Sequence, residues 1–208
     1  MPHSFANLPR LILASGSPRR RELLASLDLA FTVRPVDLDE SLRPGEEPDA
    51  YVRRLAREKA REQAEAGELI LAADTIVVLE GEVLGKPRDE DEAVAMLGSL
   101  AGREHTVLTG VCLWRPDAGE DGAGEEAAEA HTVESSRVLI APLSPERLRW
   151  YAGTGEPMDK AGSYAIQGLG AVFVERVEGN YTNVVGLPLP AVARLFEELG
   201  HDLLAFRA

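Results

Sequence analysis

Hydrophobic and polar positions along the chain follow two repeating patterns, one typical of buried strands and the other of amphipathic helices. Short apolar runs bounded by turn residues predict strands, and Gly81 marks the turn of a hairpin. Apolar positions three or four residues apart, often opened by Ser, Pro or Asp, predict helices. The predicted strands cover 10–15, 31–36, 69–74, 75–85 (the hairpin), 105–114, 131–143 and 170–179; the predicted helices cover 17–27, 48–66, 89–100, 144–153 and 187–200. Alternating strands and helices predict an α/β fold with a mixed sheet.

Composition narrows the class of protein without identifying it. The chain has 208 residues, 45% of them hydrophobic and 27% charged, which is typical of a globular protein of one domain or two small lobes. The formal net charge of −13 disfavours binding to nucleic acid and to anionic membranes, and no apolar run is long enough to cross a bilayer. The acidic stretch 115–131 lacks apolar periodicity, so we expect a mobile loop between two strands, away from the chemistry.

Two features predict a cytoplasmic location. Cys112 is the single cysteine, so the chain forms no internal disulfide, as is usual in a reducing compartment. The first ten residues lack the basic and apolar regions of a signal peptide.

The start of the first predicted helix, "ASGSPRRRELL", carries three consecutive arginines. Ser17 suits the N-cap and Pro18 the first helical position, so the arginines lie where the helix dipole disfavours cations. A bound polyanion would compensate this arrangement, because a helix N-terminus offers free N–H groups and the small residues before it allow close approach. The alternative is a solvated basic patch without a ligand.

Further charged residues fit phosphate chemistry. Lys59 lies on the apolar side of its helix and needs an anion or a cleft, unless it extends its ammonium to solvent. Asp74 ends an apolar strand, a frequent place for catalysis in α/β proteins, although a turn aspartate is the competing interpretation. Lys86 lies in a rigid Gly–Lys–Pro turn, and Gln167 follows in a glycine-punctuated segment, 157–170. These residues alone favour metal-assisted phosphate chemistry on a small anion.

The motifs "LASGSPRRRELL", "REKA", "AADT", "GKPRD", "DKAGSYAIQGLG" and "VVGLPL" resemble, in order, those of the Maf family, from about residue 11 to residue 199. The resemblance implies one domain over 1–208, with an elongated α/β fold similar to the inosine-triphosphate pyrophosphatases: a mixed sheet with flanking helices, in two lobes around a central cleft. It also implies a cytoplasmic nucleoside triphosphate pyrophosphatase that needs Mg²⁺ or Mn²⁺, forms a homodimer, and releases the nucleoside monophosphate and diphosphate.

The resemblance also assigns roles by position. It implies that Asp74 is the proton acceptor and that a divalent metal lies near Asp74 and Glu40. Elementary chemistry agrees, because water attacks phosphorus poorly unless a base orients it and cations offset the developing charge. The remaining matches are catalytic Lys59 and Lys86, and substrate-binding Ser17 and Arg20.

Three positions separate two branches of the family. Arg19, Thr75 and Gln167 match the branch that hydrolyses dTTP and UTP, whereas the 7-methyl-GTP branch has Trp, Gln and Glu there. The Gln167 amide offers a donor and an acceptor, which suits the O4 and N3–H edge shared by uracil and thymine. We therefore expect a dTTP/UTP pyrophosphatase, with modified pyrimidine nucleotides as further candidate substrates. The alternatives are a 7-methyl-GTP pyrophosphatase and a non-enzymatic nucleotide sensor that regulates cell division.

Overall fold

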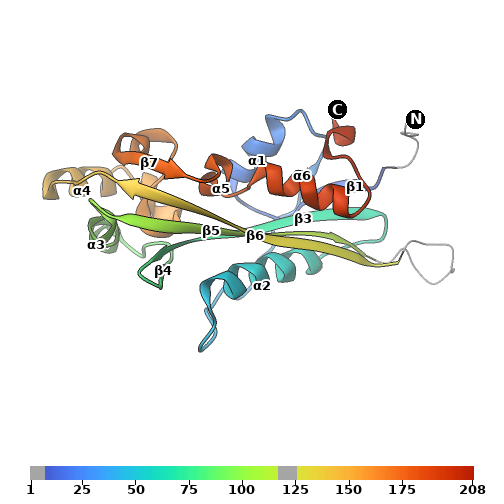
Figure 1. The fold of residues 1–208 in the computed structure, drawn as a ribbon, viewed down its shortest axis with the longest axis horizontal. Coiled ribbons are helices and arrows are strands. Elements are labelled where there is room, and N and C mark those ends of the chain that lie inside the picture. Colours follow the sequence, from blue (N-terminus) through green and yellow to red (C-terminus); the bar gives the residue numbers. More distant parts are fainter. Residues whose placement is uncertain (1–7, 117–125) are drawn as a thin grey trace. The chain divides into compact units, whose positions relative to one another are not determined.

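The structure of the protein is a computed structural model that describes residues 8–116 and 126–208 (Figure 1). Its strands form a seven-stranded sheet in the order β2-β1-β3-β5-β6-β7, with β4 paired to β3. The chain divides into two compact units: the first holds residues up to 74, 110–133 and 189–208, and the second holds 75–109 and 134–188.

The elements follow the predicted order. The strands are β1 (Arg10–Leu13), β2 (Thr32–Val33), β3 (Glu68–Leu79), β4 (Glu82–Leu84), β5 (Glu104–Arg115), β6 (Ala128–Ile140) and β7 (Val174–Glu178). The α-helices are α1 (Pro18–Ala25), α2 (Pro48–Arg61), α3 (Glu90–Leu100), α4 (Pro145–Ala152), α5 (Tyr181–Val185) and α6 (Leu189–Glu198). Short 3₁₀ helices are η1 (Glu156–Asp159), η2 (Ala161–Ser163), η3 (Gly168–Phe173) and η4 (Leu203–Phe206).

Strand pairing confirms the predicted α/β class with a mixed sheet. β1 runs parallel to β2 and β3, whereas β4 is antiparallel to β3 and β7 is antiparallel to β6. The predicted hairpin is also present, because Val78 of β3 pairs with Val83 of β4 around the turn at Gly81.

The first unit places α2 along one side of its strands and α6 along the other (Figure 1). On the α2 side, Ala56 and Ala60 belong to a buried cluster with residues of β1, β3 and β5. α2 also crosses β5 closely at Gly110. A Cβ atom at Gly110 would lie 2.3 Å from the Val52 carbonyl oxygen, so the helix backbone fits only against a residue without a side chain.

The second unit has its own core beneath α3 and α4. Tyr151 of α4 is fully buried, and its ring packs edge-to-face on Phe173 with centroids 5.2 Å apart. Leu97 and Leu100 of α3 and Val77 of β3 belong to the same buried cluster. This core supports the loops at η1, η2 and η3.

Some predicted elements differ from the observed ones. β3 continues through Asp74 to Leu79, so Asp74 lies within a strand and not at its end. The predicted strand 170–179 begins only at Val174, because the preceding residues form η3. Helix α5, capped by the Asn180 side chain, was not predicted.

The predicted acidic loop at 115–131 is only partly observable. Its segment 117–125 lies outside the described residues, whereas its last residues, from 128 onward, belong to β6. Among the described helices, none combines the length and the apolar character needed to cross a membrane.

Candidate active site

β3 presents adjacent candidate residues on opposite faces, since side chains alternate along a strand. Ile70 and Ala72 belong to the buried cluster that includes α2 residues, and Asp74 continues that face. Asp74 meets α2 directly, as its contact with Lys59 shows. Thr75, one residue later, contacts β5 and the loop after α5 instead.

Lys59 joins two carboxylates in the first unit. Its ammonium donates to Asp74 Oδ1 at 2.7 Å and lies 2.5 Å from Glu40 Oε1. Lys59 is 7% exposed and Asp74 is 8% exposed, so this contact is largely shielded from water. The predicted need of Lys59 for an anion is therefore met by the protein's own acids in this structure.

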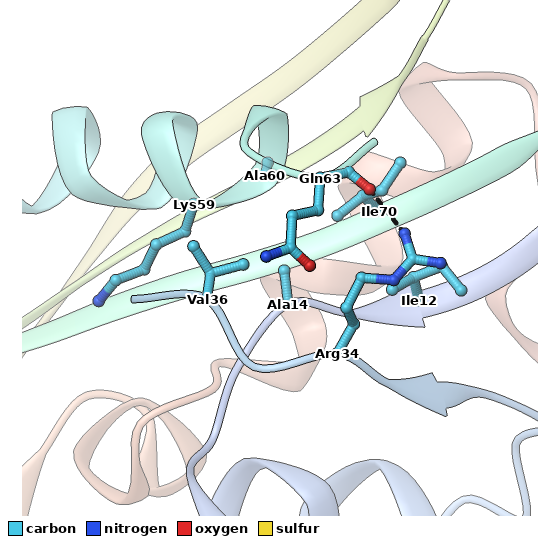
Figure 2. Close-up of a pocket in the computed structure, with 8 residues that line it drawn as sticks. All are labelled: Ile12, Ala14, Arg34, Val36, Lys59, Ala60, Gln63 and Ile70. Carbon is cyan, nitrogen blue, oxygen red and sulfur yellow. Dashed lines mark hydrogen bonds between the residues drawn. The ribbon is translucent and has the colours of Figure 1, made fainter. Parts of the chain in front are cut away.

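An apolar pocket lines the stem of Lys59. Figure 2 shows the side chain passing Val36, with its ammonium directed away from the Arg34 guanidinium. Arg34 donates to the Gln63 backbone oxygen at 2.6 Å at the other end of this pocket. The methylene groups of Lys59 therefore line this apolar pocket, while its ammonium extends beyond the pocket to Asp74 and Glu40.

A tyrosine fixes the loop that carries Glu40. Tyr51 of α2 donates its hydroxyl to the Glu40 backbone oxygen at 2.5 Å. Burial raises the pKa of Tyr51, and the nearby charges of Asp74 and Glu40 raise it further, so the hydroxyl remains a donor at neutral pH. Sequence reasoning missed Tyr51; its place eight residues before Lys59 on the same helix was the available signal.

The start of α1 places Arg20 among these charges. Ser17 caps the helix by accepting from the Arg20 backbone N–H at 3.5 Å, and Arg20 Nη1 donates to Ser15 Oγ at 3.1 Å. Burial lowers the pKa of Arg20, Asp74 and Glu40 raise it, and Arg19 lowers it. Arg20 is thus a partly desolvated cation near Asp74 and Glu40, the two acids that contact Lys59. Sequence reasoning treated Ser15 only as a small residue.

Substituting Arg20 and Arg21 of α1 one at a time distinguishes the two interpretations of these arginines, a phosphate-binding site and a solvated basic patch. Arg20 is partly buried and tied to Ser15, whereas Arg21 is exposed. We expect Arg20→Ala to weaken binding of inorganic tripolyphosphate about tenfold by calorimetry, a size typical of a charge-assisted hydrogen bond, and Arg21→Ala to change it less than about twofold. Equal losses from both substitutions would favour the solvated patch.

In the second unit, the Thr75 hydroxyl joins a small hydrogen-bond network. It lies 3.0 Å from Thr109 Oγ1 and 3.4 Å from the Gly186 carbonyl oxygen, and Thr109 donates to the Asn183 carbonyl oxygen at 3.1 Å. Because the Thr109 proton goes to the Asn183 carbonyl, Thr109 accepts from the Thr75 hydroxyl, and the Gly186 carbonyl oxygen is a second acceptor near that hydroxyl. The Thr75 hydroxyl proton is thus directed at acceptors of the protein itself.

Lys86 and Gln167 also lie in the second unit. Lys86 is exposed after β4, and its turn is held because Gly162 N–H donates to the Gly85 carbonyl oxygen at 3.1 Å. Gln167 is half-buried and has an extended backbone immediately before η3. Six of the predicted site residues therefore lie in the first unit and three in the second. The first unit holds Ser17, Arg19, Arg20, Glu40, Lys59 and Asp74, and the second holds Thr75, Lys86 and Gln167.

Comparison with known proteins identifies the family. A sequence profile described as "Maf-like protein" matches residues 10–199, which is most of the chain. The chain belongs to the Maf-like protein family. Its relatives include three named dTTP/UTP pyrophosphatase, one from Anaeromyxobacter sp. (strain Fw109-5), one from Myxococcus xanthus (strain DK1622) and one from Syntrophomonas wolfei subsp. wolfei.

The similarity to these relatives spans nearly the full length on both sides. The Anaeromyxobacter protein is 58% identical over 194 residues, covering 93% of this chain and 91% of its own length. The Myxococcus protein is 53% identical, covering 93% and 94%. The Syntrophomonas protein is 48% identical, covering 92% and 98%. The profile begins at the first residue of β1 and ends just after α6, so it covers every residue of the Maf-like candidate site.

The Maf-like site contains few carboxylates. Within residues 8–116 and 126–208, no group of three or more His, Cys, Asp and Glu side chains is placed to hold a metal ion. Instead, two carboxylates share one lysine ammonium. That donor set suits Mg²⁺, which is commonly held by one or two carboxylates together with substrate phosphates, and does not suit a metal held by protein ligands alone.

Proposed function

We propose that this chain hydrolyses dTTP and UTP to the nucleoside monophosphate and diphosphate. The observation that carries the proposal is the Lys59 ammonium between Asp74 and Glu40, in a chain 48–58% identical to relatives named dTTP/UTP pyrophosphatase. A buried lysine and aspartate, with the more exposed Glu40 and the partly buried Arg20 near them, suit a ligand that carries both negative charge and divalent cations.

In the proposed reaction, Asp74 acts on water and the cations act on phosphate. The α–β phosphoanhydride bond breaks, water supplies the new oxygen, and the Asp74 carboxylate accepts the water proton. Arg20 and Lys59 offset the negative charge of the triphosphate, since both already lie beside Asp74. We assign Ser17 to the same phosphate end as the cap of α1, and Lys86 to the leaving diphosphate.

A divalent metal fits this proposal through Asp74 and Glu40. Both carboxylates contact one ammonium, and an Mg²⁺ or Mn²⁺ ion is commonly held by one or two carboxylates together with substrate phosphates. The metal, when bound with substrate, would offset charge on the phosphate oxygens. We propose Asp74 and Glu40 as its protein ligands.

Base selection is proposed to depend on Arg19, Thr75 and Gln167. Thr75 acts as an acceptor toward ligands because its proton stays within the protein, and uracil and thymine present a donating N3–H. Cytosine presents an accepting N3 at the same place, which a Thr75 lone pair would repel. The Gln167 amide supplies the donor for O4, and Arg19 is assigned to the base by resemblance.

A panel of nucleotides tests the proposed function. With Mg²⁺ or Mn²⁺, we expect dTTP and UTP turnover within about tenfold of each other, because they differ by one methyl group worth about 1 kcal/mol. CTP and purine triphosphates should react at least about 10²-fold more slowly, because they leave buried polar groups unpaired. The readout is monophosphate and diphosphate by chromatography. Faster hydrolysis of 7-methyl-GTP than of dTTP would contradict the assigned specificity, and absence of hydrolysis would contradict the enzyme.

We propose that the enzyme acts in the cytoplasm as a single catalytic domain and a homodimer, as the resemblance to the Maf family implies. The net charge of −13 supports a small-molecule substrate over nucleic acid. Light scattering coupled to size-exclusion chromatography measures the oligomeric state directly.

A further inference from the structure

In the second unit, the Glu156 carboxylate binds the backbone just after Gln167. The Leu169 N–H donates to Glu156 Oε2 at 2.9 Å, and the Gly170 N–H donates to Glu156 Oε1 at 2.9 Å. Gly168 has φ +68°, and a Cβ atom there would lie 2.5 Å from Glu156 Oε2. The turn is therefore built closely around this carboxylate and has no room for a side chain at Gly168.

The same carboxylate also reaches the backbone before Gln167, through Tyr151. The Tyr151 hydroxyl donates to Glu156 Oε1 at 2.8 Å and accepts from the Ala165 N–H at 3.0 Å. Gly170 closes the arrangement, because a Cβ atom there would lie 2.6 Å from the Tyr151 hydroxyl oxygen. Glu156 and Tyr151 thus hold residues 165 and 169–170 together, with Gln167 between them.

These contacts favour an ionised Glu156. Its burial raises its pKa, but the N–H groups of Leu169 and Gly170 and the hydroxyl of Tyr151 lower it more, so the net pKa lies below the ordinary glutamate value. An ionised carboxylate accepts from all three donors at once. Burial also raises the pKa of Tyr151, which keeps its hydroxyl protonated as the donor.

We propose that Glu156 is a positioning residue for base selection, which together with Tyr151 fixes the backbone around Gln167. The inference rests on the proposed function, in which Gln167 reads O4 of the pyrimidine. An unrestrained amide turns over and matches uracil or cytosine equally well, so selection requires a side chain whose starting point and rotamers are fixed. Holding the chain on both sides of Gln167 supplies that restraint.

Substitution Glu156→Gln disturbs this arrangement with little change in shape. The amide offers one oxygen and one NH₂ group, whereas the site has two backbone N–H donors on different oxygens. In either orientation of the amide, Leu169 N–H or Gly170 N–H faces another donor. The turn must then open at Leu169 or Gly170, next to Gln167.

The test compares kcat and KM for dTTP and CTP in wild type and in Glu156→Gln, with Glu146→Gln as the control. Glu146 is an exposed residue of α4, so it undergoes the same chemical change away from the turn. We expect Glu156→Gln to raise KM for dTTP at least about fivefold, to change kcat less, and to lower the dTTP-to-CTP ratio of kcat/KM about tenfold or more. Glu146→Gln should match wild type in both values.

A second pair of variants shows whether Glu156 acts through Gln167. In a Gln167→Ala background, Glu156→Gln should leave the dTTP-to-CTP ratio unchanged, because the group it positions is gone. A ratio that falls equally in both backgrounds, or that stays at the wild-type value in Glu156→Gln alone, overturns the positioning role while the pyrophosphatase stands. Wild-type protein that hydrolyses neither dTTP nor UTP overturns the proposed function itself, and the inference with it.

Tyr151→Phe keeps the inference testable if Glu156→Gln does not fold. It removes only the hydroxyl that links Ala165 to Glu156, and the aromatic contact with Phe173 remains. We expect the same change in the ratio at a smaller size, about threefold. A lower melting temperature with an unchanged ratio would assign Glu156 and Tyr151 to stability alone.

Discussion

Asp74→Asn is expected to lower the turnover of dTTP about 10³-fold, within the usual range for loss of a general base. The substitution keeps the shape of the side chain but removes the charge that accepts the water proton and contributes to metal binding. Lys59 still meets Glu40 at 2.5 Å, so the fold should persist. Steady-state release of monophosphate, with the melting temperature measured in parallel, gives both values.

Asp49→Asn is the matched control for this experiment. Asp49 lies exposed in the first turn of α2 and pairs with Arg53, a surface contact worth under about 1 kcal/mol. The control should turn over dTTP like wild type. Near wild-type hydrolysis by Asp74→Asn would remove Asp74 from the reaction and require another base.

Lys59→Met is expected to damage both stability and catalysis. Methionine keeps the apolar stem against the pocket, but Asp74 and Glu40 then lie close together without the ammonium that compensates them. Breaking a buried ion pair from one side typically costs about 3–5 kcal/mol, and the partial exposure of Glu40 reduces this to about 2 kcal/mol in urea unfolding. Turnover of dTTP should fall at least about 10²-fold, because the triphosphate loses one of the cations proposed to offset its charge.

The cause of the stability loss can be tested in the same series. Adding Asp74→Asn to Lys59→Met removes one of the two uncompensated charges, so the double variant should be more stable than Lys59→Met although it stays inactive. Arg53→Met is the control, since it removes an exposed cation from the same helix and should change stability by less than about 1 kcal/mol. A double variant no more stable than Lys59→Met would point to packing of the stem instead.

The sequence predicted what depends on local pattern. The 3.6-residue period of α2 placed Lys59 on the buried side, and the Ser–Pro start of α1 predicted the cap at Ser17; the structure confirms both. Burial along a helix and capping at its start depend on residues that are close in sequence, so a local pattern can predict them.

Contacts made across the chain left no local signal. The sequence alone did not predict that Lys59 would satisfy its charge with Asp74 and Glu40, since Glu40 lies in a loop without periodicity. Glu156 was overlooked for a related reason: its partners are backbone N–H groups, which every residue except proline carries. Asp74 was expected at the end of a strand, whereas β3 continues through it, because pairing with Lys59 offsets the low preference of aspartate for strands.

Gly110 connects the packing of α2 to the chemistry at its far end. Val52 lies directly on this glycine, and Lys59 follows seven residues later, nearly two helical turns along the same face. Gly110, which has no side chain, allows α2 to approach β5 closely. It therefore contributes to the position along β3 at which the Lys59 ammonium meets Asp74. A single added methyl group at position 110 would push the α2 backbone away from β5 at Val52 and would thereby shift the Lys59 ammonium two turns away.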